Sequence, residues 1–347
     1  MTGLVLAGGG VKGAYQVGSY LAFKKCGIRI DGVVGTSIGS FNAAMIVSGK
    51  EAELYNFWKN VDVGELLNFN TKYNDSVNNK DKFKELIYGI EQMTIIVKNK
   101  GINNNNLKKL LNEMIDEEQI RNSYMDYGLV TVRVNDLKPL YLFKEDMKQG
   151  KIAEYILASC NLPVFKKEKL IDNKYYIDGG FFDNNPINML LNKGYKKIYS
   201  VEIQGIGFNQ KIKDNQRVIR IIPSRFLGST LNINKKKINE NIKLGYYDTL
   251  KILKHYDGYN FIFKKHSRLV YNILASKISK DLSKRVKRYF KAKDNKELIL
   301  RALEYVMIKE EITYFKVYEL FKQINFVKFN TKSKHFVYEF VRNLKIF

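Results

Sequence analysis

A serine between two glycines is the residue of this chain whose setting most clearly indicates chemistry. Ser37 is the centre of a Gly-x-Ser-x-Gly pentapeptide that runs from Gly35 to Gly39. An apolar stretch precedes it and a helix-like stretch follows it, which is the strand, sharp turn and helix of a nucleophile elbow. The two glycines leave the space that the strand and the helix need where they approach each other. The pattern predicts a reactive serine at the tip of the turn, although the same pentapeptide also occurs in ordinary glycine-rich turns.

A second glycine-rich segment lies between a predicted strand and a predicted helix near the N-terminus. Its spacing matches a dinucleotide-binding loop, which also needs an acidic residue at the end of the next strand. Asp31 is the available residue, but it precedes the apolar run, and the Ser37 turn occupies the end of that strand. The competing interpretation is an oxyanion hole, because bare backbone N–H groups at a helix N-terminus suit an oxyanion as well as a phosphate. The segment consists of Gly8, Gly9, Gly10, Val11, Lys12 and Gly13.

An aspartate ends a later β-like segment, and two glycines follow it. Asp178, with Gly179 and Gly180 after it, would face the active crevice if it stood at the carboxyl end of a parallel strand; an ordinary Asp-Gly turn is the alternative. A serine hydroxyl needs a base, and a carboxylate becomes a useful one when desolvation raises its ordinary pKa of about 3.9. We therefore expect Asp178 to be buried and to accept a hydrogen bond from Ser37.

Histidine is the usual base beside a catalytic serine, and the chain has three: His255, His266 and His335. Their position after Asp178 does not exclude a triad, because the histidine also follows the acid in α/β-hydrolases. However, only one βα unit precedes Ser37, whereas α/β-hydrolases place several strands before their elbow. The three histidines are therefore expected to be surface or packing residues.

The elements that must position these residues follow an α/β order. The first fifty residues are predicted to form strand, glycine loop, helix, strand, turn and helix, which indicates parallel strands with crossover helices. From about residue 231 strand patterns largely disappear and helical faces replace them. Two regions are expected: residues 1–225, which hold all three motifs, and residues 231–347, mainly helical. The helical faces comprise Ile299, Ala302, Leu303, Val306 and Met307, then Val317, Leu320, Phe321 and Ile324, and finally Val337, Phe340, Val341 and Leu344.

Charge is concentrated in the second region. The 347 residues carry a net charge of +24, and residues 231–347 alone hold 27 Lys and Arg against 11 Asp and Glu. A basic surface of this size predicts an anionic partner, either nucleic acid or an anionic membrane surface, unless it only reflects a lysine-rich composition. The densest patch runs from residue 283 to residue 291 and includes Lys284, Arg285, Lys287 and Arg288.

The remaining composition gives an expected location. Cys26 and Cys160 suggest neither a disulfide framework nor a metal site, which fits a reducing compartment. The N-terminus lacks the basic residues of a signal peptide, and no run of about 18 apolar residues predicts a spanning helix. We expect a cytoplasmic protein, with peripheral contact at the inner face of the membrane as a further expectation.

The three motifs, in this order and spacing, resemble the patatin-like phospholipase family. The resemblance covers roughly residues 3–225 and includes the segment 158–165 ahead of Asp178. It implies a three-layer α/β/α sandwich with a mainly parallel central sheet, followed here by a helical C-terminal region that the resemblance does not cover. It further implies a Ser-Asp dyad in which Ser37 is the nucleophile and Asp178 the base. By the same resemblance, the glycine loop is the oxyanion hole, with Gly9 and Gly10 as the first candidates for its donors.

The resemblance implies a lipid acyl hydrolase of the phospholipase A or lysophospholipase type, acting through an acyl-enzyme without a metal or cofactor. Its substrate would be a phospholipid or another acyl-ester lipid. One alternative is a non-hydrolytic lipid-binding or acyl-transfer protein. The other is a nucleic-acid-binding protein that uses the basic C-terminal helices. However, no nucleic-acid-binding signature is present, and nucleic acid is not expected as a partner. The sequence carries no signal for an oligomeric state.

Overall fold

The computed structural model describes residues 1–66, 103–230 and 234–344. The chain divides into two compact units, Met1–Tyr246 and Tyr247–Phe347, called here the N-terminal and C-terminal units. The division falls inside helix α10 (Lys235–Leu253), later than the boundary that the sequence suggested. Among the described helices, none combines the length and apolar character needed to cross a membrane.

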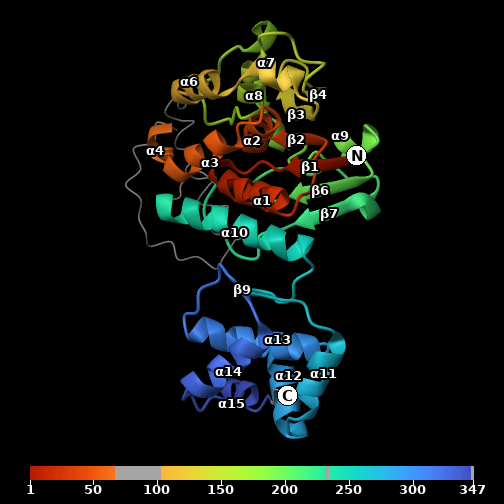
Figure 1. The fold of residues 1–347 in the computed structure, drawn as a ribbon. Helices are drawn as coiled ribbons and strands as arrows, with labels where there is room; N and C mark the ends of the chain where they lie inside the picture. Colours follow the sequence, from red (N-terminus) through yellow and green to blue (C-terminus); the bar gives the residue numbers. More distant parts are fainter. Residues whose placement is uncertain (67–102, 231–233, 345–347) are drawn as a thin grey trace. The chain divides into compact units, whose positions relative to one another are not determined.

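The N-terminal unit is built on a mixed, mostly parallel sheet with the strand order β4-β3-β2-β1-β6-β7, in which β5 also pairs with β3 (Figure 1). The pairs β1–β2, β1–β6, β2–β3 and β6–β7 are parallel, whereas β4 and β5 run antiparallel to β3. The predicted mainly parallel α/β fold is therefore confirmed. The strands are β1 (Thr2–Leu6), β2 (Gly32–Thr36), β3 (Asp126–Arg133), β4 (Lys138–Phe143), β5 (Tyr176–Asp178), β6 (Lys197–Val201) and β7 (Val218–Ile221).

Helices cover both faces of this sheet (Figure 1). On one face Phe23 of α1 (Ala14–Lys25) packs edge-on against Tyr199 of β6, with ring centroids 4.8 Å apart. On the other face α9 (Ile187–Asn192) packs against Ile198, the neighbour of Tyr199. Consecutive strand residues point to opposite faces, so these contacts define three layers. Further helices are α2 (Ile38–Val47), α3 (Glu51–Asn60), α4 (Val63–Leu66), α6 (Asn105–Met114), α7 (Glu117–Asn122) and α8 (Ile152–Ser159).

The C-terminal unit has a hydrophobic core of its own, formed by its helices. The predicted helical faces around residues 299–307 and 337–344 are buried in this core. Val317 is an exception, because it lies in a two-residue strand, β9 (Val317–Tyr318), which pairs in parallel with β8 (Ile262–Phe263). Strands this short show no two-residue periodicity, so they could not be predicted from the sequence pattern. The helices are α11 (Arg268–Ser276), α12 (Lys280–Phe290), α13 (Asn295–Lys309), α14 (Leu320–Asn330) and α15 (Phe336–Arg342).

Candidate active site

Ser37 occupies the sharp turn between β2 and α2. Its backbone has φ 54° and ψ −131°, a conformation that non-glycine residues avoid and that stores strain at functional sites. A Cβ on Gly35 would lie 2.3 Å from the carbonyl carbon of Gly39, and one on Gly39 would lie 2.0 Å from the carbonyl oxygen of Leu6. The predicted turn and the steric role of its two glycines are confirmed.

The Ser37 hydroxyl meets the Asp178 carboxylate. Ser37 Oγ donates a hydrogen bond to Asp178 Oδ2 at 2.5 Å, and the amide of Gly180 donates to Oδ1 at 2.7 Å. The serine is 9% exposed and the aspartate 3%. Burial raises the pKa of Asp178 to about 6, against the opposing effect of the two hydrogen bonds. The predicted burial and hydrogen bond are confirmed, and the carboxylate has a proton affinity suited to a base near neutral pH.

Asp178 lies at the end of a strand whose direction differs from the one expected. Strand β5 is antiparallel, not parallel, to its neighbour β3, and Asp178 pairs with Thr131. The last residue of β2, Thr36, pairs with Val130 on the same side of β3 as β5, because β4 pairs along the opposite side. The chain therefore turns back toward the sheet from beyond its carboxyl edge and stops beside the elbow. Adjacent positions on one central strand fix the distance between Ser37 and Asp178.

The glycine loop lies against the elbow. A Cβ on Gly8 would be 3.1 Å from Ser37 Cβ. The amides of Gly8, Val11 and Lys12 donate to the carbonyl oxygens of Asn184, Thr230 and Gly9, respectively. The amides of Gly9 and Gly10, by contrast, donate to no protein acceptor within residues 1–66, 103–230 and 234–344. Two donors thus remain for an oxyanion among the predicted loop residues.

A buried polar network holds both ends of the glycine loop. Gln16 Nε2 of α1 donates to the carbonyl oxygen of Ala7 at 2.6 Å, and Asn42 Nδ2 of α2 donates to that of Gly13 at 3.1 Å. The side chain of Asn42 also donates from Nδ2 to Gln16 Oε1 at 2.8 Å, and its Oδ1 accepts from Trp58 Nε1 of α3 at 2.9 Å. Three helices therefore fix the loop next to Ser37, and the sequence patterns gave no sign of this network.

Two further residues, Ser159 and Asn184, support the site, and no sequence pattern indicated this role. Ser159 Oγ accepts a hydrogen bond from the amide of Ser37 at 2.9 Å and donates to the carbonyl oxygen of Val130 at 2.7 Å. Asn184 binds Gly8 twice: its carbonyl oxygen accepts from the Gly8 amide, and its Nδ2 donates to the Gly8 carbonyl oxygen at 3.2 Å. Ser159 thus ties the elbow to β3, and Asn184 ties the glycine loop to the segment after Asp178.

The structure also shows what surrounds Asp31 and the three histidines, which are the residues that the dinucleotide-binding and triad alternatives would need. Asp31 precedes β2, at the opposite end of that strand from Ser37, and its Oδ2 accepts from the amide of Thr2 at 2.7 Å. It is therefore no candidate for a ribose contact beside the glycine loop. The three histidines belong to the C-terminal unit, where the ring of His266 lies 5.2 Å from that of Phe321 and the ring of His335 stacks on Tyr305 at 5.4 Å. Cys26 and Cys160 are both free thiols.

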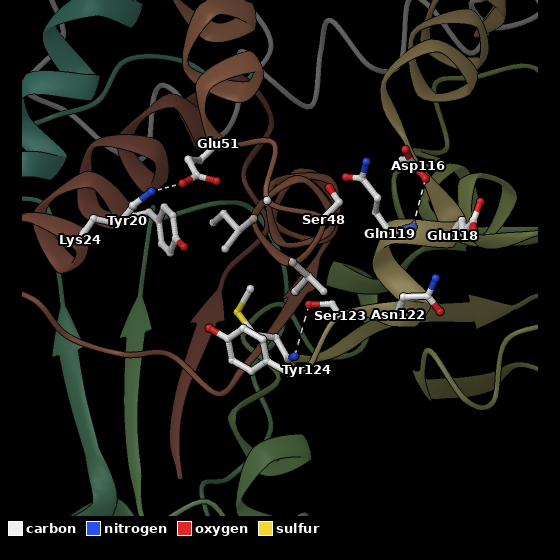
Figure 2. A pocket seen from close by; sticks show the side chains of 14 residues that line it. Tyr20, Lys24, Ser48, Glu51, Asp116, Glu118, Gln119, Asn122, Ser123 and Tyr124 are labelled. Atoms are coloured by element: carbon white, nitrogen blue, oxygen red, sulfur yellow. Dashed lines mark hydrogen bonds and ion pairs between the residues drawn. The ribbon is translucent and has the colours of Figure 1, made fainter.

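A hollow of about 780 Å³ in the N-terminal unit is a separate feature. Figure 2 shows Tyr20 and Tyr124 on one side of it and Gln119 on the other. The C-terminal end of α2 contributes to its lining, whereas Ser37 precedes the N-terminal end of the same helix. A helix of this length separates its ends by roughly 15 Å. The hollow therefore contains neither Ser37 nor Asp178.

Comparisons with known proteins identify relatives of one kind. The family model described as patatin-like phospholipase matches residues 4–191. The lysophospholipase nte1 of Aspergillus terreus is 24% identical over 208 residues, which are 60% of this chain and 12% of that protein. Its counterpart in Aspergillus oryzae is 25% identical with the same coverage. The match thus takes in only about an eighth of the length of these relatives.

Among solved structures, VipD from Legionella pneumophila is similar to 98% of this chain and 83% of its own, with 15% identity and a TM-score of 0.46. The family assignment rests on the family model, which matches more than half of the chain. The elbow, the glycine loop and the Asp-Gly-Gly segment all lie within that match and meet in one site. This chain belongs to the patatin-like phospholipase family.

Proposed function

We propose that the protein is a lipid acyl hydrolase of the phospholipase A or lysophospholipase type that acts through a Ser37–Asp178 dyad. The hydrogen bond between the strained, nearly buried serine and the buried carboxylate carries this proposal. Membership of the patatin-like phospholipase family and the similarity to lysophospholipases support it. The chain corresponds to a small part of those relatives, so their activity enters here as a proposal.

In the proposed mechanism, Ser37 Oγ attacks the acyl carbonyl carbon while its proton passes to Asp178. The amides of Gly9 and Gly10 stabilise the oxyanion of the tetrahedral intermediate. Collapse of the intermediate breaks the ester C–O bond, and the departing alcohol takes the proton from Asp178, which leaves an acyl-serine. Water then attacks this ester with Asp178 as base, and the second intermediate releases the fatty acid and restores Ser37.

Electrostatics account for most of the acceleration in this scheme. Helix α2 begins at the residue after Ser37, so its positive end faces the developing negative charge. Fixed amide donors stabilise charge that exists only in the transition state, and the loss of one such donor costs about 2.7–4 kcal/mol in known enzymes. The tether from Ser159 keeps the elbow amide paired and leaves the hydroxyl as the reactive group.

The direct test incubates a mixed phospholipid extract with the wild type and with Ser37→Ala and identifies the released lipids by mass spectrometry. We expect fatty acid and lysolipid or glycerophosphodiester from the wild type only, and fluorophosphonate labelling of Ser37. Ser48→Ala is a matched control, because Ser48 is also 9% exposed and follows the other end of α2. Full activity of Ser37→Ala, or an active wild type that resists labelling, would contradict the serine mechanism.

We further propose that the basic C-terminal unit binds anionic membranes. Helix α12 exposes Lys284, Arg285, Lys287 and Arg288, while Val286 faces the core. Each basic side chain near an anionic bilayer contributes about 1 kcal/mol, and salt screens this attraction. Sedimentation with liposomes should show binding that requires anionic lipid and decreases with salt.

Reversal of these four charges should weaken that binding. A matched control reverses four exposed lysines of the N-terminal unit and should have a smaller effect. Equal binding to neutral vesicles would contradict electrostatic docking without affecting the Ser37 chemistry. The control residues are Lys25, Lys59, Lys109 and Lys166.

A further inference from the structure

Three large apolar side chains are exposed at the edge of the sheet that carries Ser37. Phe181 is 40% exposed, Ile206 48% and Phe208 67%. Single exposed apolar residues are common on proteins, but contiguous ones mark interaction sites. Whether these three form a contiguous surface depends on the backbone contacts between their segments.

Main-chain hydrogen bonds bring these segments together. The amide of Phe208 donates to the carbonyl oxygen of Gly180 at 2.9 Å, and the amide of Asn184 donates to that of Phe208 at 2.6 Å. Phe181 follows Gly180 directly, so Phe181 and Phe208 are neighbours in space. We call Phe181, Ile206 and Phe208 the apolar rim.

The same loop also lies against the glycine loop. A Cβ on Gly205 would lie 2.0 Å from the carbonyl oxygen of Gly8 and 2.7 Å from the Cα of Gly9. Lys12, only 7% exposed, donates from Nζ to the carbonyl oxygen of Gln204 at 3.2 Å. Residues 204–208 thus contact both the segment that holds Asp178 and the loop that offers the oxyanion donors. The apolar rim therefore lies beside both segments that form the Ser37 site.

Aromatic side chains extend this surface beyond Phe181. The rings of Tyr141 and Phe182 meet edge-on with centroids 6.4 Å apart, and Tyr141 is 37% exposed. The Tyr141 hydroxyl donates to Asp183 Oδ2 at 3.1 Å, which fixes its orientation. A basic side chain lies close by in the sequence, since Lys211 is exposed three residues after Phe208. This surface is thus apolar and aromatic, and a basic side chain follows it in the sequence.

We propose that the apolar rim inserts into a phospholipid bilayer, so that the mouth of the Ser37 site opens directly onto the membrane. This inference rests on the proposed function. Ser37 is nearly buried, so an acyl-ester lipid must leave its neighbours in part before its carbonyl reaches the hydroxyl. Phe181, Ile206 and Phe208 replace the lost contacts along the acyl chain, because apolar side chains and lipid tails are equally excluded from water. The net charge of +24 favours an anionic bilayer over a neutral one.

A fluorescence experiment tests insertion without using activity. Phe208→Trp is made in a Ser37→Ala background and mixed with vesicles of phosphatidylcholine and phosphatidylglycerol, with and without brominated acyl chains. We expect a blue shift of the new tryptophan and quenching by bromine. The native Trp58 is 2% exposed and supplies a constant background.

Tyr124→Trp is the matched control in the same unit. Tyr124 is 69% exposed but precedes β3, at the sheet edge opposite the apolar rim. One bilayer cannot contact both edges of a rigid sheet, so this tryptophan should be neither shifted nor quenched. Quenching at neither position, or equally at both, would overturn the proposal, and this holds whether or not the wild type hydrolyses lipids.

A second measurement compares turnover of vesicle lipid with turnover of a water-soluble p-nitrophenyl ester. Ile206→Ser combined with Phe208→Ser should lower the ratio of vesicle to soluble turnover about tenfold or more for each side chain, as expected for apolar groups that no longer enter lipid. Leucine at both positions should restore the ratio, and Tyr124→Ser should leave it unchanged. An unchanged ratio in the double serine variant would contradict insertion. If no ester is hydrolysed at all, the proposed function fails, and the fluorescence result alone decides the inference.

Discussion

Each unit of the molecule contains a buried carboxylate, and the two differ in what surrounds them. Asp178 in the N-terminal unit is 3% exposed, and Glu304 in the C-terminal unit is 2% exposed. Burial raises the pKa of both groups. Glu304 accepts hydrogen bonds from the consecutive amides of Tyr259, Asn260 and Phe261. Asp178 accepts one from an amide and one from the hydroxyl of Ser37.

This difference shows that burial and a raised pKa do not by themselves mark a catalytic group. The donors to Glu304 are three main-chain amides of a tight loop and the side-chain amide of Asn260 in the same loop, so its role is structural. Asp178 faces a serine with φ 54° and lies in the same site as two backbone amides that have no acceptor in the described part of the chain. The reactive neighbour makes the carboxylate a candidate base. The following variants test this contrast, from the largest expected effect to the smallest.

Asp178→Asn should remove most turnover, by about 10²- to 10⁴-fold, because an amide cannot take the proton of Ser37. In the wild type, kcat/KM should fall as the pH is lowered through about 6, the pKa of Asp178 in the folded protein. An unperturbed aspartate would give this fall at about pH 4. A pH–rate profile with a soluble ester measures the midpoint, and an unchanged profile in Asp178→Asn would remove the dyad.

The same substitution should increase stability. The folded-state pKa of Asp178 is raised, so folding is most favoured when the group is protonated, and this contribution is lost as the pH rises from about 4 through about 6. A shift of about two pH units corresponds to about 3 kcal/mol. Urea unfolding of Asp178→Asn should therefore give a higher free energy of unfolding than the wild type above pH 6, with little difference near pH 4. A variant less stable than the wild type at every pH would refute this sign.

Gly10→Ala should lower kcat by about 10²- to 10³-fold with a smaller change in KM, because the loop stabilises charge that appears only in the transition state. Gly10 has φ 56°, and a Cβ there would lie 2.2 Å from the carbonyl oxygen of Thr230, so the loop must move. Gly194→Ala is the control: it also has a positive φ, but no heavy atom lies within 4 Å of the added Cβ. If KM alone rises, the loop binds substrate and does not stabilise the oxyanion. Micromolar binding of a nicotinamide cofactor that Gly10→Ala weakens would revive the dinucleotide interpretation.

Glu304→Gln should lower stability by about 1–3 kcal/mol, because one amide of the 259–261 loop then faces an NH₂ group instead of a carboxylate oxygen. The turnover of the folded enzyme with a soluble ester should not change. Denaturant unfolding and a rate normalised to folded protein separate the two effects. A loss of turnover in folded Glu304→Gln would show that the contrast between the two carboxylates is wrong.

The smallest effects are expected at the three histidines. His255→Ala, His266→Ala and His335→Ala should each keep most of the activity with a soluble ester. His335 caps α15 by accepting from the amide of Val337, so its replacement should cost about 1 kcal/mol of stability. If any one of these variants is folded but inactive, the site contains a triad.

The sequence by itself determined the local features of this protein. Gly-x-Ser-x-Gly specifies its own turn, because only glycine fits where the strand and helix touch within five residues. The helix Ala14–Lys25 and the buried faces of α13 and α15 follow from local periodicity, which the sequence displays directly. The same is true of the change from an α/β pattern to a helical one.

Tertiary structure alone decided what these local features face. Ser37 and Asp178 are 141 residues apart, and their hydrogen bond depends on β2 and an antiparallel β5 pairing with one side of β3, which no periodicity indicates. Long-range acceptors at Asn184 and Thr230 pair with two amides of the glycine loop, whereas those of Gly9 and Gly10 have no acceptor among the described residues. Ser159, Asn184 and the apolar rim likewise gain their roles from neighbours distant in the chain. Hydrogen bonds and burial depend on which segments meet in space, whereas a single sequence records directly only neighbours along the chain.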